Sequence, residues 1–205
     1  MAKLEIKICG ISDPKSCTTA IQHNVNYLGF VFYKKSHRNL TIEQAKHLTS
    51  LVPKFVKKVA VLVRPEQEFV KKIKDMFDYL QVYESSPSEI QQLKLTSGKK
   101  IIQAIKIKKK SDVELYKQYI GIADEFLFDS SSMEKSSSFN WGYLKNIEIK
   151  DFFLAGGIGL DNINQAIKTS KKIDISSKLE DTHGKKSAKK IIEFLLKIKE
   201  INERN

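Results

Sequence analysis

Short apolar runs alternate with amphipathic segments along the whole chain. The runs at residues 30–32 and 59–63 are continuously apolar, which is typical of strands that are buried on both faces of a parallel sheet. Strands are expected at eight places, residues 5–9, 27–33, 57–63, 79–84, 101–107, 125–129, 151–155 and 172–176.

The segments between these runs have helical spacing, and some begin with clear start signals. Asp13 is a suitable N-cap with Pro14 at the first helical position, and Thr41 with Gln44 forms a capping-box pattern. Helices are expected at residues 14–24, 41–51, 65–77, 88–95, 112–120, 141–146, 161–168 and 187–201. Eight strand–helix pairs in 205 residues predict an α/β fold, a compact (β/α)8 TIM barrel with a single domain over residues 1–205.

An open, doubly wound sheet has the same alternation of strands and helices. However, no G-x-G-x-x-G segment follows the first expected strand, which weighs against a dinucleotide-binding fold. The closed barrel is therefore the preferred interpretation. In such a barrel the active site lies at the carboxyl ends of the strands, where Cys9, Asp129 and the pair Gly156-Gly157 stand in this sequence.

The net charge of +12 raises the question of a nucleic-acid partner. The excess comes from lysines spread over nearly every segment, whereas the chain has only three arginines, Arg38, Arg64 and Arg204. Nucleic-acid readers depend on arginine for bidentate contacts, so we expect no nucleic-acid partner. A diffuse positive charge still attracts small anions.

Nothing in the sequence indicates a membrane partner. No apolar stretch approaches the roughly 18 residues of a membrane-spanning helix, and the first residues lack the apolar region of a signal peptide. A cytoplasmic protein is therefore expected. Cys9 and Cys17 are too few for a disulfide scaffold, and the histidines have no metal-binding spacing, so no metal is expected. Cys17 is interpreted as a small packed side chain.

Several motifs resemble those of the phosphoribosylanthranilate isomerase family of tryptophan biosynthesis. In chain order they are Lys7-Ile8-Cys9-Gly10-Ile11, Leu28-Gly29-Phe30-Val31-Phe32, Lys35-Ser36-His37-Arg38, Phe128-Asp129-Ser130, Phe139-Asn140-Trp141, Leu154-Ala155-Gly156-Gly157-Ile158 and Asp174-Ile175-Ser176-Ser177-Lys178-Leu179-Glu180. The resemblance extends from about residue 5 to residue 195. It implies a cofactor-free Amadori rearrangement of N-(5-phosphoribosyl)anthranilate to 1-(2-carboxyphenylamino)-1-deoxyribulose 5-phosphate, with Asp129 as the acid and Cys9 as the base.

Each of these two roles makes a physical demand. Cys9 must ionise, and Lys7 lies on the same face of the strand, so its ammonium favours the thiolate. We expect Asp174, on the eighth strand, to pair with Lys7. Asp129 must keep a proton near pH 7, which requires an apolar setting, although strand alternation points the neighbouring phenylalanines away from it. A structural cysteine and a capping aspartate are the alternatives that spacing alone leaves open.

Substrate-binding groups are expected in the loops. Gly156-Gly157 and Ser176-Ser177 follow strands seven and eight, where barrels often bind phosphate through backbone N–H groups, although tight turns also require glycine. Arg38 follows strand two and is expected to bind the anthranilate carboxylate. Arg64 is a second candidate for that role, and the alternative for Arg38 is a solvated loop. The basic run at residues 106–110 is interpreted as a solvated strand exit.

The sequence also departs from the family pattern. The usual Gly-rich loop before Phe-Asp-Trp is replaced by the serine-rich residues 131–138, and the usual Gln-Leu-His-Gly is Gln81-Val82-Tyr83-Glu84. Lys178 replaces a glycine after the serine pair, and we expect its cation to compensate near the phosphate. We expect catalysis by a monomer or homodimer. The alternative is an inert barrel that binds a phosphorylated metabolite or a protein partner.

Overall fold

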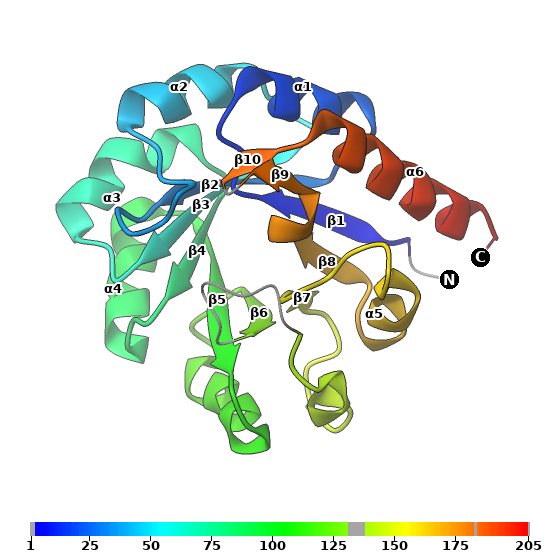
Figure 1. The fold of residues 1–205 in the computed structure, drawn as a ribbon. Coiled ribbons are helices and arrows are strands. Elements are labelled where there is room, and N and C mark those ends of the chain that lie inside the picture. The colour runs from blue at the N-terminus through cyan, green and yellow to red at the C-terminus, as the bar shows by residue number, and fades with distance from the viewer. Residues whose placement is uncertain (1–2, 131–137, 183, 205) are drawn as a thin grey trace.

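The computed structural model describes residues 3–130, 138–182 and 184–204. Its centre is a closed barrel of parallel strands in sequence order, with the last strand hydrogen-bonded to the first (Figure 1). The strands are β1 (Glu5–Cys9), β2 (Tyr27–Phe32), β3 (Lys57–Val63), β4 (Tyr79–Tyr83), β5 (Lys100–Ile107), β6 (Glu125–Ser130), β7 (Phe153–Leu154) and β8 (Lys172–Ile175). The predicted TIM barrel is confirmed.

Helices connect the strands and surround the barrel (Figure 1). They are α1 (Pro14–Gln22), α2 (Ile42–Ser50), α3 (Gln67–Ile73), η1 (Lys74–Met76), α4 (Pro87–Ser97), η2 (Lys110–Tyr119), η3 (Trp141–Leu144), α5 (Ile163–Thr169), η4 (Ser177–Leu179) and α6 (Ala188–Arg204). Both predicted start signals are present. The Asp13 side chain accepts the Ser16 N–H at 2.8 Å, and Thr41 with Gln44 forms a complete capping box.

Some predicted elements differ from the structure. The expected helix at 65–77 is divided into α3 and η1, and η2 is a 3₁₀ helix whose start is held by Asp112, which accepts the N–H groups of Lys108 and Lys109. Strand β7 is shorter than the expected 151–155. A hairpin of β9 (Glu180–Thr182) and β10 (Lys185–Lys186) was not predicted, because its few charged residues carry no strand pattern.

The apolar side chains form two layers, which explains the continuous apolar runs. On β2, Leu28 and Phe30 point outward into the core between barrel and helices, whereas Tyr27 and Val31 point into the barrel. The barrel interior is packed rather than hollow. Its amino-terminal end also holds a hydrogen bond from the Tyr27 hydroxyl to the Glu5 carboxylate, 2.7 Å long.

Candidate active site

A cavity of about 390 Å³ opens at the carboxyl ends of the strands, a size within the usual range for small-molecule sites. Its lining includes eight residues that the sequence analysis selected: Cys9, Arg38, Asp129, Gly156, Gly157, Asp174, Ser176 and Ser177. Lys7, the remaining candidate, lies two residues before Cys9 on β1 and is fully buried. The fold therefore brings together residues from both ends of the chain.

Lys7 and Asp174 form the predicted ion pair where β8 meets β1. The two residues are register partners, and Lys7 Nζ lies 2.9 Å from Asp174 Oδ1. Burial opposes the charged ammonium, but Asp174 and then Cys9 outweigh it and raise the pKa of Lys7. Gly29 on β2 makes room for this arrangement, because a Cβ there would lie 3.0 Å from Lys7 Nζ and 3.2 Å from Cys9 Sγ.

Cys9 is a free thiol at the end of β1, and its side chain is almost completely buried. Burial raises the pKa of Cys9, while the nearby cations Lys7, Lys186 and Arg38 lower it and Asp174 raises it. The net direction corrects the expectation from Lys7 alone, since desolvation prevails over the neighbouring ammonium. Cys17 is also free and fully buried in α1, as expected for a packed side chain.

Asp129 lies near the end of β6 and is partly buried in the wall of the cavity. Burial, reinforced by the negative charge of Asp174, raises the pKa of Asp129 to about 6. The Tyr83 hydroxyl donates to Asp129 Oδ2 at 3.0 Å and acts in the opposite direction. As expected, Phe128 points away from Asp129 and packs edge-on against Tyr116 and Phe152. Asp129 is therefore shielded from water by the residues at the mouth of the barrel and not by this phenylalanine.

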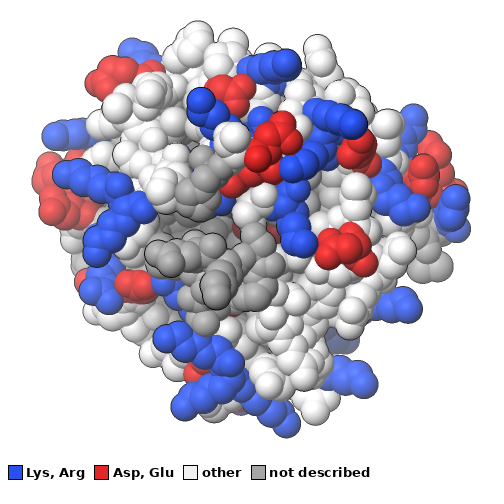
Figure 2. Space-filling view, in the orientation of Figure 1, with Lys and Arg blue, Asp and Glu red and all other residues white. Residues whose placement is uncertain are grey.

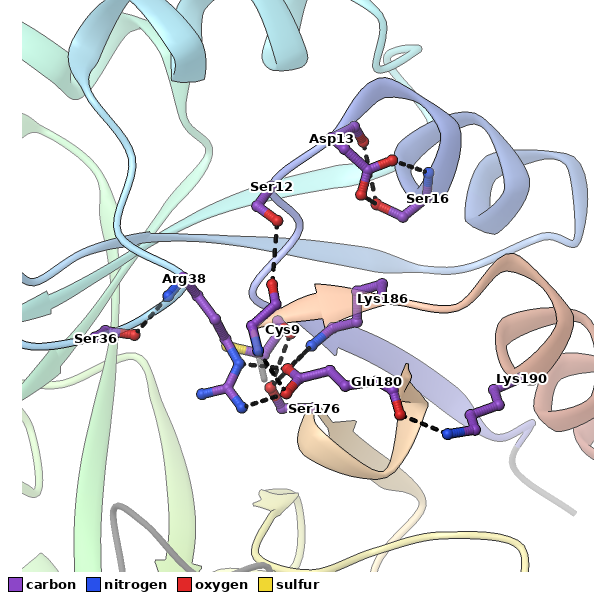
Figure 3. Close-up of polar contacts among 11 residues, drawn as sticks. Cys9, Ser12, Asp13, Ser16, Ser36, Arg38, Ser176, Glu180, Lys186 and Lys190 are labelled. Atoms are coloured by element: carbon purple, nitrogen blue, oxygen red, sulfur yellow. Dashed lines mark hydrogen bonds and ion pairs between the residues drawn. The ribbon is translucent and has the colours of Figure 1, made fainter. Parts of the chain in front are cut away.

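Arg38 reaches into the cavity from the loop after β2, and its guanidinium is held by Glu180 (Figure 3). Nε and Nη2 donate to the two carboxylate oxygens at 2.5 and 3.0 Å. Its side chain crosses directly over Gly10, where a Cβ would lie 2.3 Å from Arg38 Cδ. The guanidinium thus lines the cavity as expected, but two of its donors already bind a carboxylate of the protein.

Glu180 was not selected from the sequence, although it ends a motif that supported the family resemblance. Its carboxylate also accepts Lys186 Nζ at 2.7 Å and the Gly184 N–H at 3.1 Å. Burial opposes its charge, but Arg38 and Lys186 outweigh that effect and lower the pKa of Glu180 to about 2. The side chain of Lys186 is fully buried. These contacts attach the β9–β10 hairpin to the mouth of the barrel (Figure 3).

The two loops expected to bind phosphate border the same cavity. Gly156 has φ +88°, and a Cβ there would lie 2.7 Å from Ser130 N, so this turn requires glycine whether or not it binds an anion. Ser176 Oγ donates to the Cys9 carbonyl at 3.0 Å, which ties the loop after β8 to β1. The serine-rich stretch that replaces the family's glycine-rich loop lies outside the described residues over 131–137.

Three secondary expectations need correction. Lys178 pairs with Asp161 at 3.4 Å and lines a separate cavity rather than the one bordered by the expected phosphate loops. Arg64 pairs with Glu84 on the surface and does not line the active-site cavity. Lys106 does line it, with its Nζ 5.8 Å from the centre of the Tyr83 ring, and is therefore not a purely solvated strand exit.

The described residues contain no group of His, Cys, Asp or Glu suited to a metal ion. His183 lies outside the described residues. None of the helices in the described ranges is long and apolar enough to cross a membrane.

Comparisons with known proteins show the family to which this chain is similar. A family model for N-(5′-phosphoribosyl)anthranilate isomerase matches residues 6–197. Relatives that carry this name include one from Petrotoga mobilis, 36% identical with 97% of this chain and 98% of the relative covered. Another, from Streptococcus mutans, is 34% identical with 95% and 98% covered.

Solved structures agree as well. The crystal structure of phosphoribosyl anthranilate isomerase from Thermotoga maritima superimposes with a TM-score of 0.87 at 26% identity, covering 96% of this chain and 99% of that one. A further structure of such an isomerase, in complex with reduced 1-(o-carboxyphenylamino)-1-deoxyribulose 5-phosphate, gives a TM-score of 0.82 at 26% identity and covers 96% and 99% of the two chains.

Fold, cavity and relatives together define a (β/α)8-barrel enzyme of the isomerase class. Within that class, the chain belongs to the N-(5′-phosphoribosyl)anthranilate isomerase family, whose reaction is a step of tryptophan biosynthesis.

Proposed function

We propose that this cavity isomerises N-(5′-phosphoribosyl)anthranilate to 1-(2-carboxyphenylamino)-1-deoxyribulose 5-phosphate, with Asp129 as general acid and Cys9 as general base. The observation that carries these roles is that the carboxyl on β6 and the thiol on β1 line one cavity, although 120 residues separate them in the sequence. A carboxyl with a pKa of about 6 keeps a protonated fraction near neutral pH, as a general acid requires.

The reaction consists of proton transfers and bond rearrangements within the substrate and needs no cofactor. Asp129 protonates the ribose ring oxygen, the C1–O bond breaks, and the anthranilate nitrogen supplies the electrons that form a Schiff base. Cys9 then removes the proton from C2, which gives an enolamine. Protonation at C1 and loss of the C2 hydroxyl proton produce the ketone. Asp129 thus acts on the ring oxygen, and Cys9 acts on C2 of the same sugar.

The two pKa values decide how much enzyme is ready to react. The acid must be protonated although its pKa is about 6, and the base must be ionised although burial raises the pKa of Cys9. The correctly protonated form is therefore a minority at every pH and reaches its maximum above pH 6, between the two values. Lys7, Lys186 and Arg38 enlarge this fraction because they favour the thiolate.

Binding is assigned to the loops around the two catalytic groups. The phosphate would lie against Gly156 and Gly157 and the Ser176-Ser177 turn, which border the cavity. Arg38 faces the anthranilate carboxylate, with Glu180 fixing the orientation of the guanidinium. Lys7 and Asp174 support Cys9 through their buried ion pair.

Fluorescence tests the catalytic roles, because substrate and product both carry the anthranilate group. Purified Cys9→Ala and Asp129→Asn proteins should fold but lose about 10²- to 10⁴-fold in turnover, the usual contribution of acid–base groups. Cys17→Ala and Asp75→Asn are matched controls outside the cavity and should retain turnover.

Normal turnover in both site variants would refute the assignment. A wild-type protein that binds a reduced product analogue without turning over substrate would favour the inert barrel instead.

The remaining properties belong to the same proposal. A single domain over residues 1–205 is supported by the one closed barrel that contains strands β1 to β8. A monomer or homodimer, a cytoplasmic location and the absence of a nucleic-acid partner stay predictions. Size-exclusion chromatography with light scattering determines the oligomeric state directly.

A further inference from the structure

A chain of three side chains runs from the barrel interior to the acid. Gln81 and Tyr83 lie two residues apart on β4 and therefore point to the same side of the sheet. Gln81 is fully buried, and its Nε2 lies 3.1 Å from the Tyr83 hydroxyl. The hydroxyl lies 3.0 Å from Oδ2 of Asp129, which is on β6. The phenol thus reaches across β5 to the carboxyl.

The chemistry of the first donor fixes the direction of the chain. An amide NH₂ group only donates, so the oxygen of Tyr83 accepts from Gln81. The single proton of the phenol is then available for Asp129 Oδ2. Burial, followed by the negative charge of Asp129, raises the pKa of Tyr83 well above its ordinary value. The phenol therefore stays protonated and acts as a donor at every working pH.

We propose that Tyr83 is a positioning residue for the acid: it occupies Oδ2 of Asp129, so that Oδ1 carries the proton delivered to the sugar. This inference rests on the proposed function, since it concerns how the assigned acid is held. Tyr83 belongs to the stretch Gln81-Val82-Tyr83-Glu84, where this sequence departs from the family motif that has histidine. A phenol keeps the donor but, unlike an imidazole, has no charged form near neutral pH.

The bond from Tyr83 also restrains the acid. Burial raises the pKa of Asp129, and the Tyr83 hydroxyl and the Ser130 N–H lower it because they bind the ionised carboxylate. Without the phenol the carboxyl would hold its proton more tightly and release it less readily to the ring oxygen. Tyr83 therefore sets both which oxygen is acidic and how acidic it is.

Carbon-13 NMR of protein labelled at the aspartate Cγ tests this directly. The resonance missing from Asp129→Asn identifies Asp129, and its titration midpoint in the wild type is expected near pH 6. In Tyr83→Phe the midpoint should rise by roughly one pH unit, the effect of losing one hydrogen bond to a carboxylate. The acidic limb of the kcat/KM profile should move upward with it.

Tyr27→Phe is the matched control, because it removes another phenol–carboxylate hydrogen bond, to Glu5, at the opposite end of the barrel. This variant should leave the Asp129 midpoint unchanged. If Tyr83→Phe fails to fold, Gln81→Met removes the amide donor instead and should raise the midpoint by a smaller amount.

An Asp129 midpoint that stays the same or falls in the folded variants overturns the inference. The titration needs no turnover, so it is independent of the proposed reaction. Failure of the proposed function would appear separately, as normal turnover in Asp129→Asn.

Discussion

At the scale of single residues, the site concentrates ionisable groups that folding would otherwise avoid. Lys7 and Asp174 compensate each other inside the barrel, whereas Asp129 has a hydrogen bond but, among the described residues, no direct cationic partner. Its raised pKa is therefore a cost in free energy of folding whenever the carboxyl is ionised. Proton donation and stability place opposite demands on this one side chain.

Replacement of Asp129 by Asn should stabilise the protein at neutral pH. The folded-state pKa of about 6 exceeds the ordinary 3.8, so the unfolded chain releases this proton first and wild-type stability falls as pH rises from 4 to 6. Asn carries no such penalty. The variant should exceed the wild type by about 3 kcal/mol at pH 7.5, and this advantage should fall to about 1 kcal/mol at pH 4.5.

Urea unfolding at the two pH values measures this difference. Asp75→Asn, an exposed aspartate on η1, should show no comparable gain. An Asp129→Asn protein that is less stable than the wild type at pH 7.5 would contradict the prediction.

The sequence was sufficient for some residue contacts and insufficient for others. Lys7 and Asp174 were predictable because alternation along a strand and closure of the barrel fix which side chains meet. Tyr83 and Asp129 belong to strands separated by β5, and their contact depends on the stagger of the strands and on a rotamer. Glu180 reaches Arg38 through a hairpin path that no sequence pattern specified.

At the scale of elements, the β9–β10 hairpin has a role larger than its size. The Glu180 carboxylate on β9 binds Arg38, which links the hairpin to the barrel. The same carboxylate binds Lys186 on β10, which links the two strands of the hairpin. The hairpin therefore joins the mouth of the barrel to the last helix, α6. The position of the hairpin therefore depends on the Glu180 carboxylate, which is almost completely buried.

Glu180→Ala should destabilise the protein by about 3–5 kcal/mol, because it leaves the buried ammonium of Lys186 without this carboxylate. The double variant Glu180→Leu/Lys186→Met removes both charges and should recover most of the loss. Chemical unfolding at pH 7 measures both effects. Asp161→Ala breaks the exposed pair with Lys178 and should cost less than about 1 kcal/mol. Equal losses from the buried and exposed pairs would contradict this interpretation.

The beginnings of elements were predicted better than their interiors. Asp13 and Thr41 carry capping side chains whose hydrogen bonds are local, so sequence alone defines where α1 and α2 start. The 3₁₀ geometry of η2 and the shortness of β7 depend on packing against neighbouring strands, which sequence spacing does not encode.

At the scale of the whole molecule, the positive charge is dispersed. Figure 2 shows lysine and arginine around much of this face, with aspartate and glutamate between them. Such a field attracts small anions in general, and on the face shown the described lysines and arginines form no continuous track for a nucleic-acid backbone. Lys35 and Lys106 extend the positive charge into the cavity itself.

Binding of a substrate that carries both a phosphate and a carboxylate should therefore depend on salt. The KM is expected to rise several-fold when NaCl increases from about 0.02 to 0.2 M, because screening weakens the attraction. An uncharged solute at equal viscosity serves as the control and should leave the KM unchanged. Random duplex DNA should bind only weakly at physiological salt. A submicromolar dissociation constant for such DNA would argue against a dispersed field.

Ring closure between β1 and β8 has a consequence for synthesis of the protein on the ribosome. Cys9 and Lys7 emerge first, but Asp174 and Ser176, which bind Lys7 and the Cys9 carbonyl, are made more than 160 residues later. Until those residues leave the exit tunnel, β1 and β7 each have one edge without a partner strand, and the Cys9 thiol is uncovered. The nascent chain thus carries an accessible thiol until β8 pairs with β1, so protection of this sulfur from a thiol reagent would report closure of the barrel.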